Sequence, residues 1–294
     1  MRQVIFPFCI AVLFASCAKD GIIHEDLIID GNQPPEVTGV SIVEVNNYVN
    51  SLYIDLYGRT PTSEELSAAT NLLIEADYDS LSRQELVAGM MANWEYYKNF
   101  NLLISQQYLV DADSVSMQYQ IEYWEYVIDL YTDAGDALEV AYYTWELNRL
   151  LDLTTAHVDY ANGTIDINTY FRRYLDNYYY DQVNMGSLNF VISVFNNVFH
   201  RYPTNDEEAS GVAMVDGSTE QLFLMDGSSK GDFMDIMTTT PEFYQGLIIS
   251  AYTAFLARNP TAAEIDFFTQ QLLEGVSYHD IKKTILTGEE YAGF

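Results

Sequence analysis

Apolar residues recur every three or four positions along most of this chain, which is the pattern of helices that bury one side. Tyr48, Leu52 and Leu56, for example, lie four residues apart and form one apolar stripe. No stretch alternates convincingly between apolar and polar residues, as a strand ladder would. Only residues 212–226, which are bordered by glycines, predict a short hairpin or an irregular loop. The sequence therefore predicts an all-α fold with no large sheet.

Three segments, 48–66, 190–208 and 247–265, align without gaps. Each has a helix-periodic apolar stretch followed by Arg-x-Pro-Thr-x-x-Glu, and such self-similarity indicates a repeated supersecondary unit. The motif residues are Arg59, Pro61, Thr62 and Glu65 in the first copy, Arg201, Pro203, Thr204 and Glu207 in the second, and Arg258, Pro260, Thr261 and Glu264 in the third.

The motif has a local physical explanation as a turn between two helices. Pro61 pushes Thr60 towards an extended conformation, and Thr62 followed three residues later by Glu65 predicts a capping box. Each motif arginine lies at a helix C-terminus, where a cation meets unpaired carbonyls. We favour this structural role over the binding of an anionic ligand. An ion pair with a later glutamate is also conceivable, and the candidates are Glu95, Glu242 and Glu290.

Each unit reads as helix, turn, helix, loop and helix, and ends in Glu-aromatic. The pattern resembles bacterial helical repeat families of unknown function with a Leu-x-Arg-x-Pro-Thr-x-x-Glu … Glu-Tyr signature, and it is similar to phycobilisome linker domains. The resemblance implies three helix-turn-helix copies, one in residues 41–100 and two in residues 188–294. It implies secreted or cell-surface proteins and transfers no catalytic residues.

Residues 101–187 lie outside the repeats and predict a helical insert rich in tyrosine and tryptophan. Asp166 is expected to cap a helix that runs through Tyr170 and Leu175. Three adjacent tyrosines on a helix point in different directions, so at least one is expected to be exposed. We therefore predict Tyr178, Tyr179 and Tyr180 as a partner-contact surface. Asn46 or Asn47 is expected to open the first helix of the chain.

The first sixteen residues are typical of a signal peptide. Arg2 is followed by an apolar run and by Ala15-Ser16-Cys17. Residues 14–17 resemble a bacterial lipobox, which implies cleavage before Cys17, lipidation of Cys17 and a tether over residues 17–40. The alternative is an ordinary cleaved signal with a chance cysteine. A transmembrane anchor is disfavoured, because the apolar run is too short for ~30 Å of hydrocarbon.

Composition narrows the classes of partner. The formal charge is −30 and becomes −31 once Arg2 leaves with the signal peptide, so a nucleic-acid partner is not expected. The only cysteines are Cys9 and Cys17, which leaves the folded body without a disulfide or a cysteine nucleophile. The 24 tyrosines favour a folded, aromatic-rich protein. Their usual place is a core edge, and the alternative is a binding face.

The sequence contains no catalytic or phosphate-binding motif, and no histidines at metal-ligand spacing. We therefore expect no enzyme and no cofactor. Residues 111–114 and 226–232 resemble calcium loops only weakly, because both lack the closing bidentate glutamate. Calcium remains a weak alternative at these two places.

The leading functional hypothesis is a lipid-anchored, non-enzymatic interaction or scaffold subunit of a bacterial outer-membrane complex with an envelope protein partner. Ala18-Lys19-Asp20 resembles the export tags of lipoproteins on the outer face of that membrane, and the periplasmic face is the alternative location. A glycan-binding surface lipoprotein that uses exposed tyrosines is the second hypothesis. A hydrolase that uses paired carboxylates is the third.

Overall fold

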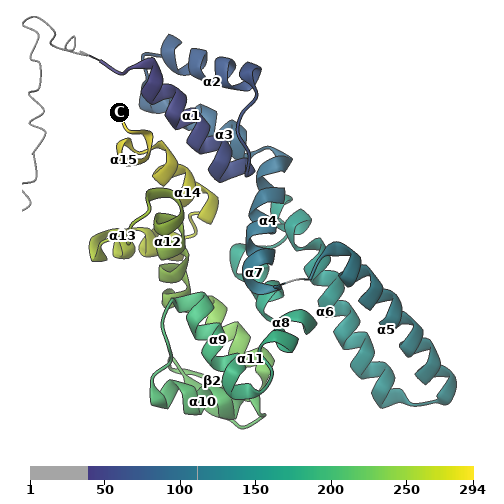
Figure 1. Cartoon of the computed structure of the whole chain (residues 1–294). Coiled ribbons are helices and arrows are strands. Elements are labelled where there is room, and N and C mark those ends of the chain that lie inside the picture. Colours follow the sequence, from purple (N-terminus) through teal and green to yellow (C-terminus); the bar gives the residue numbers. More distant parts are fainter. Residues whose placement is uncertain (1–38, 111) are drawn as a thin grey trace, which may run out of the picture. The chain divides into compact units, whose positions relative to one another are not determined.

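Helices make up most of the described chain, as the sequence predicts. The computed structural model describes residues 39–110 and 112–294, and Figure 1 shows how its elements are arranged. The N-terminal helices are α1 (Ile42–Tyr57), α2 (Ser63–Glu75), α3 (Ser80–Met91) and α4 (Trp94–Tyr108). The next four are α5 (Ser114–Ala134), α6 (Ala137–Ala161), α7 (Ile167–Leu175) and α8 (Tyr178–Val183). The C-terminal helices are α9 (Ser187–Phe199), α10 (Asn205–Val215), α11 (Lys230–Thr239), α12 (Pro241–Leu256), α13 (Ala262–Leu273), α14 (Tyr278–Thr287) and α15 (Glu289–Ala292).

The one sheet among the described residues is a two-stranded antiparallel hairpin. Its strands are β1 (Glu220–Leu222) and β2 (Met225–Gly227), and Leu222 pairs with Met225. The turn consists of Phe223 and Leu224, which both have positive φ angles, as a tight two-residue hairpin requires. The hairpin ends one residue beyond the segment for which the sequence predicted a hairpin or a loop.

Side chains at the helix starts fix where several helices begin. Ser41 and Glu44 form a capping box before α1. The expectation that Asn46 or Asn47 opens this helix is therefore wrong, because the box lies earlier in the chain. Asp166 accepts a hydrogen bond of 2.8 Å from the backbone N–H of Thr169, which confirms the predicted cap of α7.

Residues Gly39–Phe294 form one compact unit that contains two clusters of buried apolar side chains. The smaller cluster joins α1, α2 and α3 to the C-terminal helices α14 and α15. The Tyr48 hydroxyl, for example, donates to the carbonyl of Leu286 at 3.1 Å, and the Tyr291 hydroxyl donates to Asp55 at 2.6 Å. The larger cluster extends through α4 to α14, the insert included. Helices from both ends of the described chain are thus held together.

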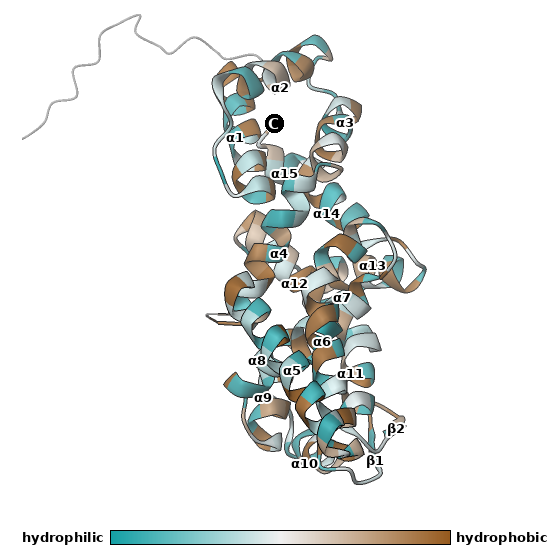
Figure 2. Cartoon of the chain, turned by 90° about the vertical axis from the view of Figure 1, so that its right-hand side faces the viewer, coloured by the Kyte–Doolittle hydropathy of each residue, from teal (hydrophilic) through white to brown (hydrophobic). Residues whose placement is uncertain are grey.

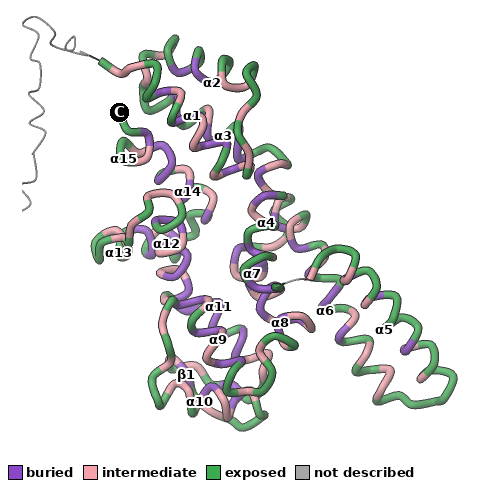
Figure 3. Tube along the Cα trace, in the orientation of Figure 1, coloured by how far each residue is buried: buried purple, intermediate pink, exposed green. Residues whose placement is uncertain are grey.

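Helices α5 and α6 form an antiparallel helical hairpin (Figure 1). α5 packs mainly against α6, and Figure 3 shows α5 exposed along most of its length. None of the helices in the described ranges is long and apolar enough to cross a membrane. The predicted signal peptide, Cys17 and the tether up to residue 38 lie outside the described residues.

Candidate functional site

The three Arg-x-Pro-Thr turns have the same hydrogen-bond geometry. In the first turn, Arg59 Nε donates to Glu95 at 2.5 Å. The two terminal nitrogens of Arg59 donate to the two carboxylate oxygens of Glu65, both at 2.8 Å. They also donate to Glu95 and to the carbonyl of Thr60. Every N–H group of this guanidinium is therefore used within the protein.

The other two turns repeat this arrangement. The Nε atoms of Arg201 and Arg258 donate at 2.5 Å to Glu242 and Glu290. Their terminal nitrogens make paired hydrogen bonds with Glu207 and Glu264. The ion pairs with Glu95, Glu242 and Glu290, which the sequence left as a possibility, are thus present. The capping boxes of Thr62 with Glu65, Thr204 with Glu207 and Thr261 with Glu264 are also present.

These contacts determine what the turns can do chemically. Hydrogen bonds from Arg59, and then from the Thr62 backbone, lower the pKa of Glu65 to about 2. Arg201 in the same way lowers the pKa of Glu207 to about 2. Both carboxylates are charged at neutral pH and paired with a guanidinium that has no free donor. The geometry supports a structural role for the motif, since an anionic ligand would find no open hydrogen-bond donor on the arginine.

The predicted partner-contact surface at Tyr178, Tyr179 and Tyr180 needs correction. Tyr180 is buried in the core, and its hydroxyl accepts a hydrogen bond from Asn197 at 2.8 Å. Tyr178 and Tyr179 are half-buried, and Tyr178 packs edge-to-face against the buried Trp124 of α5. The expectation that at least one of the three is exposed is wrong. The reason is that α5 and α6 cover this turn.

Exposed aromatic side chains gather instead on the outer face of α5. Tyr119 and Tyr126 are 71% and 64% exposed. A spacing of three, four or seven residues keeps side chains on one side of a helix, and five exposed residues follow it. This exposed stripe consists of Val115, Tyr119, Tyr123, Tyr126 and Leu130. Figure 2 shows the hydrophobic positions along α5 interspersed with hydrophilic ones.

The hairpin that carries the exposed stripe is strongly acidic. Residues 99–148 contain no lysine, arginine or histidine, and eight aspartates or glutamates lie between residues 112 and 148. Arg149, the first cation after this segment, stacks on Trp145 and makes ion pairs with Glu146, Asp176 and Asp181. The exposed stripe is thus an apolar, aromatic surface surrounded by negatively charged side chains.

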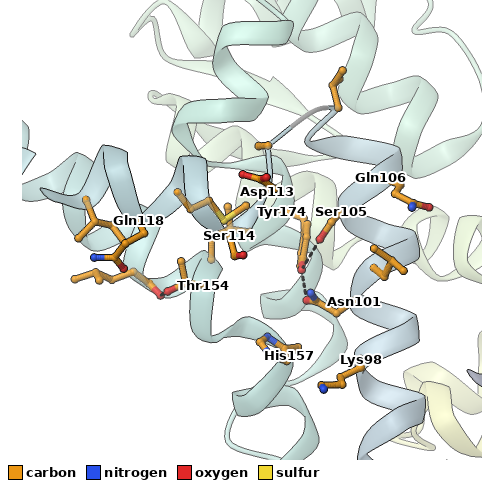
Figure 4. A pocket seen from close by; sticks show the side chains of 17 residues that line it. Lys98, Asn101, Ser105, Gln106, Asp113, Ser114, Gln118, Thr154, His157 and Tyr174 are labelled. Carbon is orange, nitrogen blue, oxygen red and sulfur yellow. Dashed lines mark hydrogen bonds between the residues drawn. The ribbon is translucent and has the colours of Figure 1, made fainter. Parts of the chain in front are cut away.

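A cavity of about 810 Å³ lies at the base of this hairpin, between α4, the start of α5, α6 and Tyr174 of α7. Figure 4 shows its lining side chains. The Tyr174 hydroxyl donates to Asn101 and lies 3.4 Å from the Ser105 hydroxyl. Burial lowers the pKa of His157, so this imidazole is neutral at pH 7.

The described lining of this cavity combines apolar side chains with amide and hydroxyl groups and one cation, Lys98. Amide and hydroxyl groups on its walls come from Asn101, Ser105, Gln106, Gln118 and Thr154. Asp113 is the single carboxylate among the described residues of the lining, and it accepts hydrogen bonds as the N-cap of α5.

The structure places the calcium candidates as follows. Asp226 accepts a hydrogen bond from the Gln221 amide, and Asp232 accepts from the backbone N–H of Ser228. Asp111 lies outside the described residues. Over residues 39–110 and 112–294, no three histidine, cysteine, aspartate or glutamate side chains are arranged to hold a metal ion.

No protein-family model, curated protein or solved structure matches this chain. The sequence did contain a signal for the exposed stripe, since Tyr119, Tyr123 and Tyr126 recur at helical spacing. Helical spacing alone does not distinguish an inner from an outer face, so the stripe emerges only from the packing of α5 against α6.

Proposed function

We propose that this protein is a lipid-anchored, non-enzymatic interaction subunit of a bacterial outer-membrane complex, and that the exposed stripe on α5 binds its protein partner. The observation that carries the proposal is the second apolar face of α5. Its inner face, with Ile121 and Trp124, is buried, whereas Tyr119 and Tyr126 point outwards. Contiguous exposed apolar residues with a polar rim are typical of protein-interaction sites.

The charge around the stripe indicates the chemistry of the partner. Glu122, Asp129 and Asp133 follow the same spacing and border the aromatic residues. A complementary partner surface would place lysine or arginine around an apolar centre. The opposite charges would attract the two proteins at long range and align the two surfaces once they meet. Tyrosine is well suited to such a site, because it buries a large ring at a small cost in side-chain entropy.

Site-specific photocrosslinking tests this proposal. A photoreactive phenylalanine derivative replaces Tyr119 or Tyr126 in the acylated protein within intact envelopes. The matched control replaces Tyr202, which is 72% exposed but lies in the turn after α9. We expect both hairpin positions to capture the same protein through a segment that contains lysine or arginine. We expect no capture from Tyr202.

Charge reversal makes the test specific. Glu122→Lys with Asp129→Lys should abolish capture at Tyr126, and added salt should weaken capture by the unchanged protein. Equal capture from Tyr202, or capture that is indifferent to the charge reversal, would refute the role of the stripe.

The membrane part of the proposal depends on Cys17. Its support is the signal-like sequence that precedes this residue. Mass spectrometry of the mature N-terminus should find a diacylglyceryl group on Cys17, and Cys17→Ser should release the protein from membranes. Protease treatment of intact cells then separates the outer face of the outer membrane from the periplasmic face.

Glycan binding is a second candidate, and the cavity at the base of the hairpin favours it. The cavity offers amide and hydroxyl groups to sugar hydroxyls, and its volume of about 810 Å³ falls in the range of small-molecule sites. A glycan array probes it directly. Binding that is lost in Asn101→Ala and kept in Tyr119→Ser would support this function over the protein-partner function.

A further inference from the structure

Lys282 is a buried lysine without a hydrogen-bond partner. Lys282 is only 3% exposed, and its side-chain amine has no hydrogen-bond acceptor in the described chain. Three aromatic rings surround the amine. Nζ lies 4.0 Å from the centroid of Phe100, 4.6 Å from that of Tyr278 and 4.9 Å from that of Tyr96.

A buried amine of this kind requires an explanation. Lysine is almost never fully buried unless it is paired, and buried polar groups without partners are rare in folded proteins. The ring faces stabilise a cation, but they give the amine hydrogens no lone pair to bond. The hydroxyl of Tyr96 and Nε2 of the neighbouring His279 are also buried without partners. Three unsatisfied polar atoms therefore belong to one cluster.

A cavity of about 190 Å³ adjoins this cluster, between α1, α4, α7, α12 and α14. Lys282 and all three surrounding rings belong to its walls. Its walls also include the exposed residues Leu103 and Ala254, whereas Lys282 is buried. A cavity of about 150 Å³ is enough to hold a benzene-sized molecule.

We propose that this cavity binds a small hydrophobic carboxylate of about the size of one ring, with its carboxylate on the amine of Lys282 and its apolar part towards Leu103 and Ala254. The carboxylate supplies the acceptor that the amine lacks, and the apolar walls bury the rest of the molecule. The charge-assisted hydrogen bond to the amine orients the ligand, and the apolar walls select for its shape.

The other titratable groups of the walls are compatible with an anion. Asp55 is the single carboxylate among the described residues of the lining, and it accepts a hydrogen bond from Tyr291, which is not part of the lining. Burial raises the pKa of Tyr96, Tyr108 and Tyr278, so these phenols stay neutral. His279 contacts Tyr96 but is not part of the lining, and burial lowers its pKa, which leaves that imidazole neutral as well. Lys282 is thus the group that can pair with an anion.

Calorimetric titration with benzoate at about pH 6, where the amine of Lys282 is charged, tests the proposal on the whole chain. Benzamide is the neutral ligand of the same shape. We expect benzoate to bind and benzamide to bind at least about tenfold more weakly, which is the loss expected when a charged hydrogen bond is replaced. Lys282→Met should weaken benzoate binding by about the same factor and should leave benzamide binding unchanged.

A second variant keeps the test valid if Lys282→Met alters the fold. Ala254→Leu leaves the amine in place and narrows the cavity at an exposed residue of its wall, and it should weaken both ligands together. Equal binding of benzoate and benzamide, or benzoate binding that survives both substitutions, would overturn the proposal. So would the absence of benzoate binding to the unchanged protein.

Discussion

Lys282 should make the stability of this protein depend on pH above neutrality. Burial lowers the pKa of its amine from 10.5 to about 7. Between these two values the amine is neutral in the folded protein and charged in the unfolded chain, so the unfolded chain binds more protons. The free energy of unfolding therefore rises with pH over this window. Below about pH 7 the amine is charged in both states, and the full cost of burying the cation is present.

The size of the effect follows from the shift. One pKa unit corresponds to about 1.4 kcal/mol, so the linkage relation gives a gain of about 3 kcal/mol between about pH 7 and pH 9.5. Ring contacts of the charged amine offset about 1 kcal/mol of the burial cost, and we therefore expect about 2 to 3 kcal/mol. Burial also raises the pKa of several tyrosines, among them Tyr48, Tyr180 and Tyr278, which lowers the free energy of unfolding of any variant as the pH approaches about 10. The contribution of Lys282 is therefore the difference between the unchanged protein and a variant without the amine. Burial lowers the pKa of His279 to about 3, so its contribution is lost only as the pH falls below neutrality.

Urea unfolding at about pH 7, 8 and 9.5 measures this gain. Lys282→Met is the matched variant, because methionine is unbranched and its sulfur packs well on aromatic rings. We expect the unchanged protein to gain stability relative to the variant by about 2 to 3 kcal/mol across the series, and the variant to be the more stable of the two at about pH 7. Parallel curves for the two proteins would show that this amine does not titrate as proposed, and the reasoning would be wrong.

Two further substitutions test the packing of the scaffold by urea unfolding. Arg201→Lys keeps the charge but loses the paired hydrogen bonds to Glu207, and should cost about 1 kcal/mol, a small value because the side chain is partly exposed. A gain or no change would contradict the role of the guanidinium fork. Gly246→Ala places a Cβ atom 1.9 Å from the carbonyl oxygen of Val198 and should cost about 3 kcal/mol or more. Its control, Gly89→Ala, meets no atom within 4 Å in an exposed part of α3 and should stabilise the protein by about 0.5–1 kcal/mol. Equal effects at the two glycines would refute this packing argument.

The features that the sequence predicted correctly depend on residues close together in the chain. The capping box of Thr62 with Glu65 spans three residues, and so does the cap that Asp166 gives to α7. The pairing of Arg59 with Glu95 is more distant. It was accessible because a glutamate followed by an aromatic residue recurs after each of the three turns, although the separation from the arginine varies from 32 to 41 residues. Local chemistry and internal comparison therefore account for these predictions.

Burial of the aromatic residues depends on contacts that the helical period does not specify. Tyr126 and Tyr174 both lie in helical patterns, yet Tyr126 is exposed and Tyr174 is buried. Tyr180 was misplaced for this reason. The sequence did indicate that Lys282 lies on the buried side of α14, because its spacing from Tyr278, Ile281 and Ile285 places it on the same apolar stripe. The sequence alone does not show whether such a lysine extends to solvent or stays inside, since that is decided by the rings of α4.

The exposed stripe on α5 is the feature that folding explains least. α5 has an inner face of Met117, Ile121, Trp124 and Val127, and one apolar face is enough to hold a helix against its neighbours. A second apolar face adds exposed area without further stabilising the fold. The surrounding carboxylates keep such a surface soluble, and because residues 99–148 contain no cation, they also make two copies of the hairpin repel each other. Charge thus disfavours self-association through the stripe and favours a partner of opposite sign.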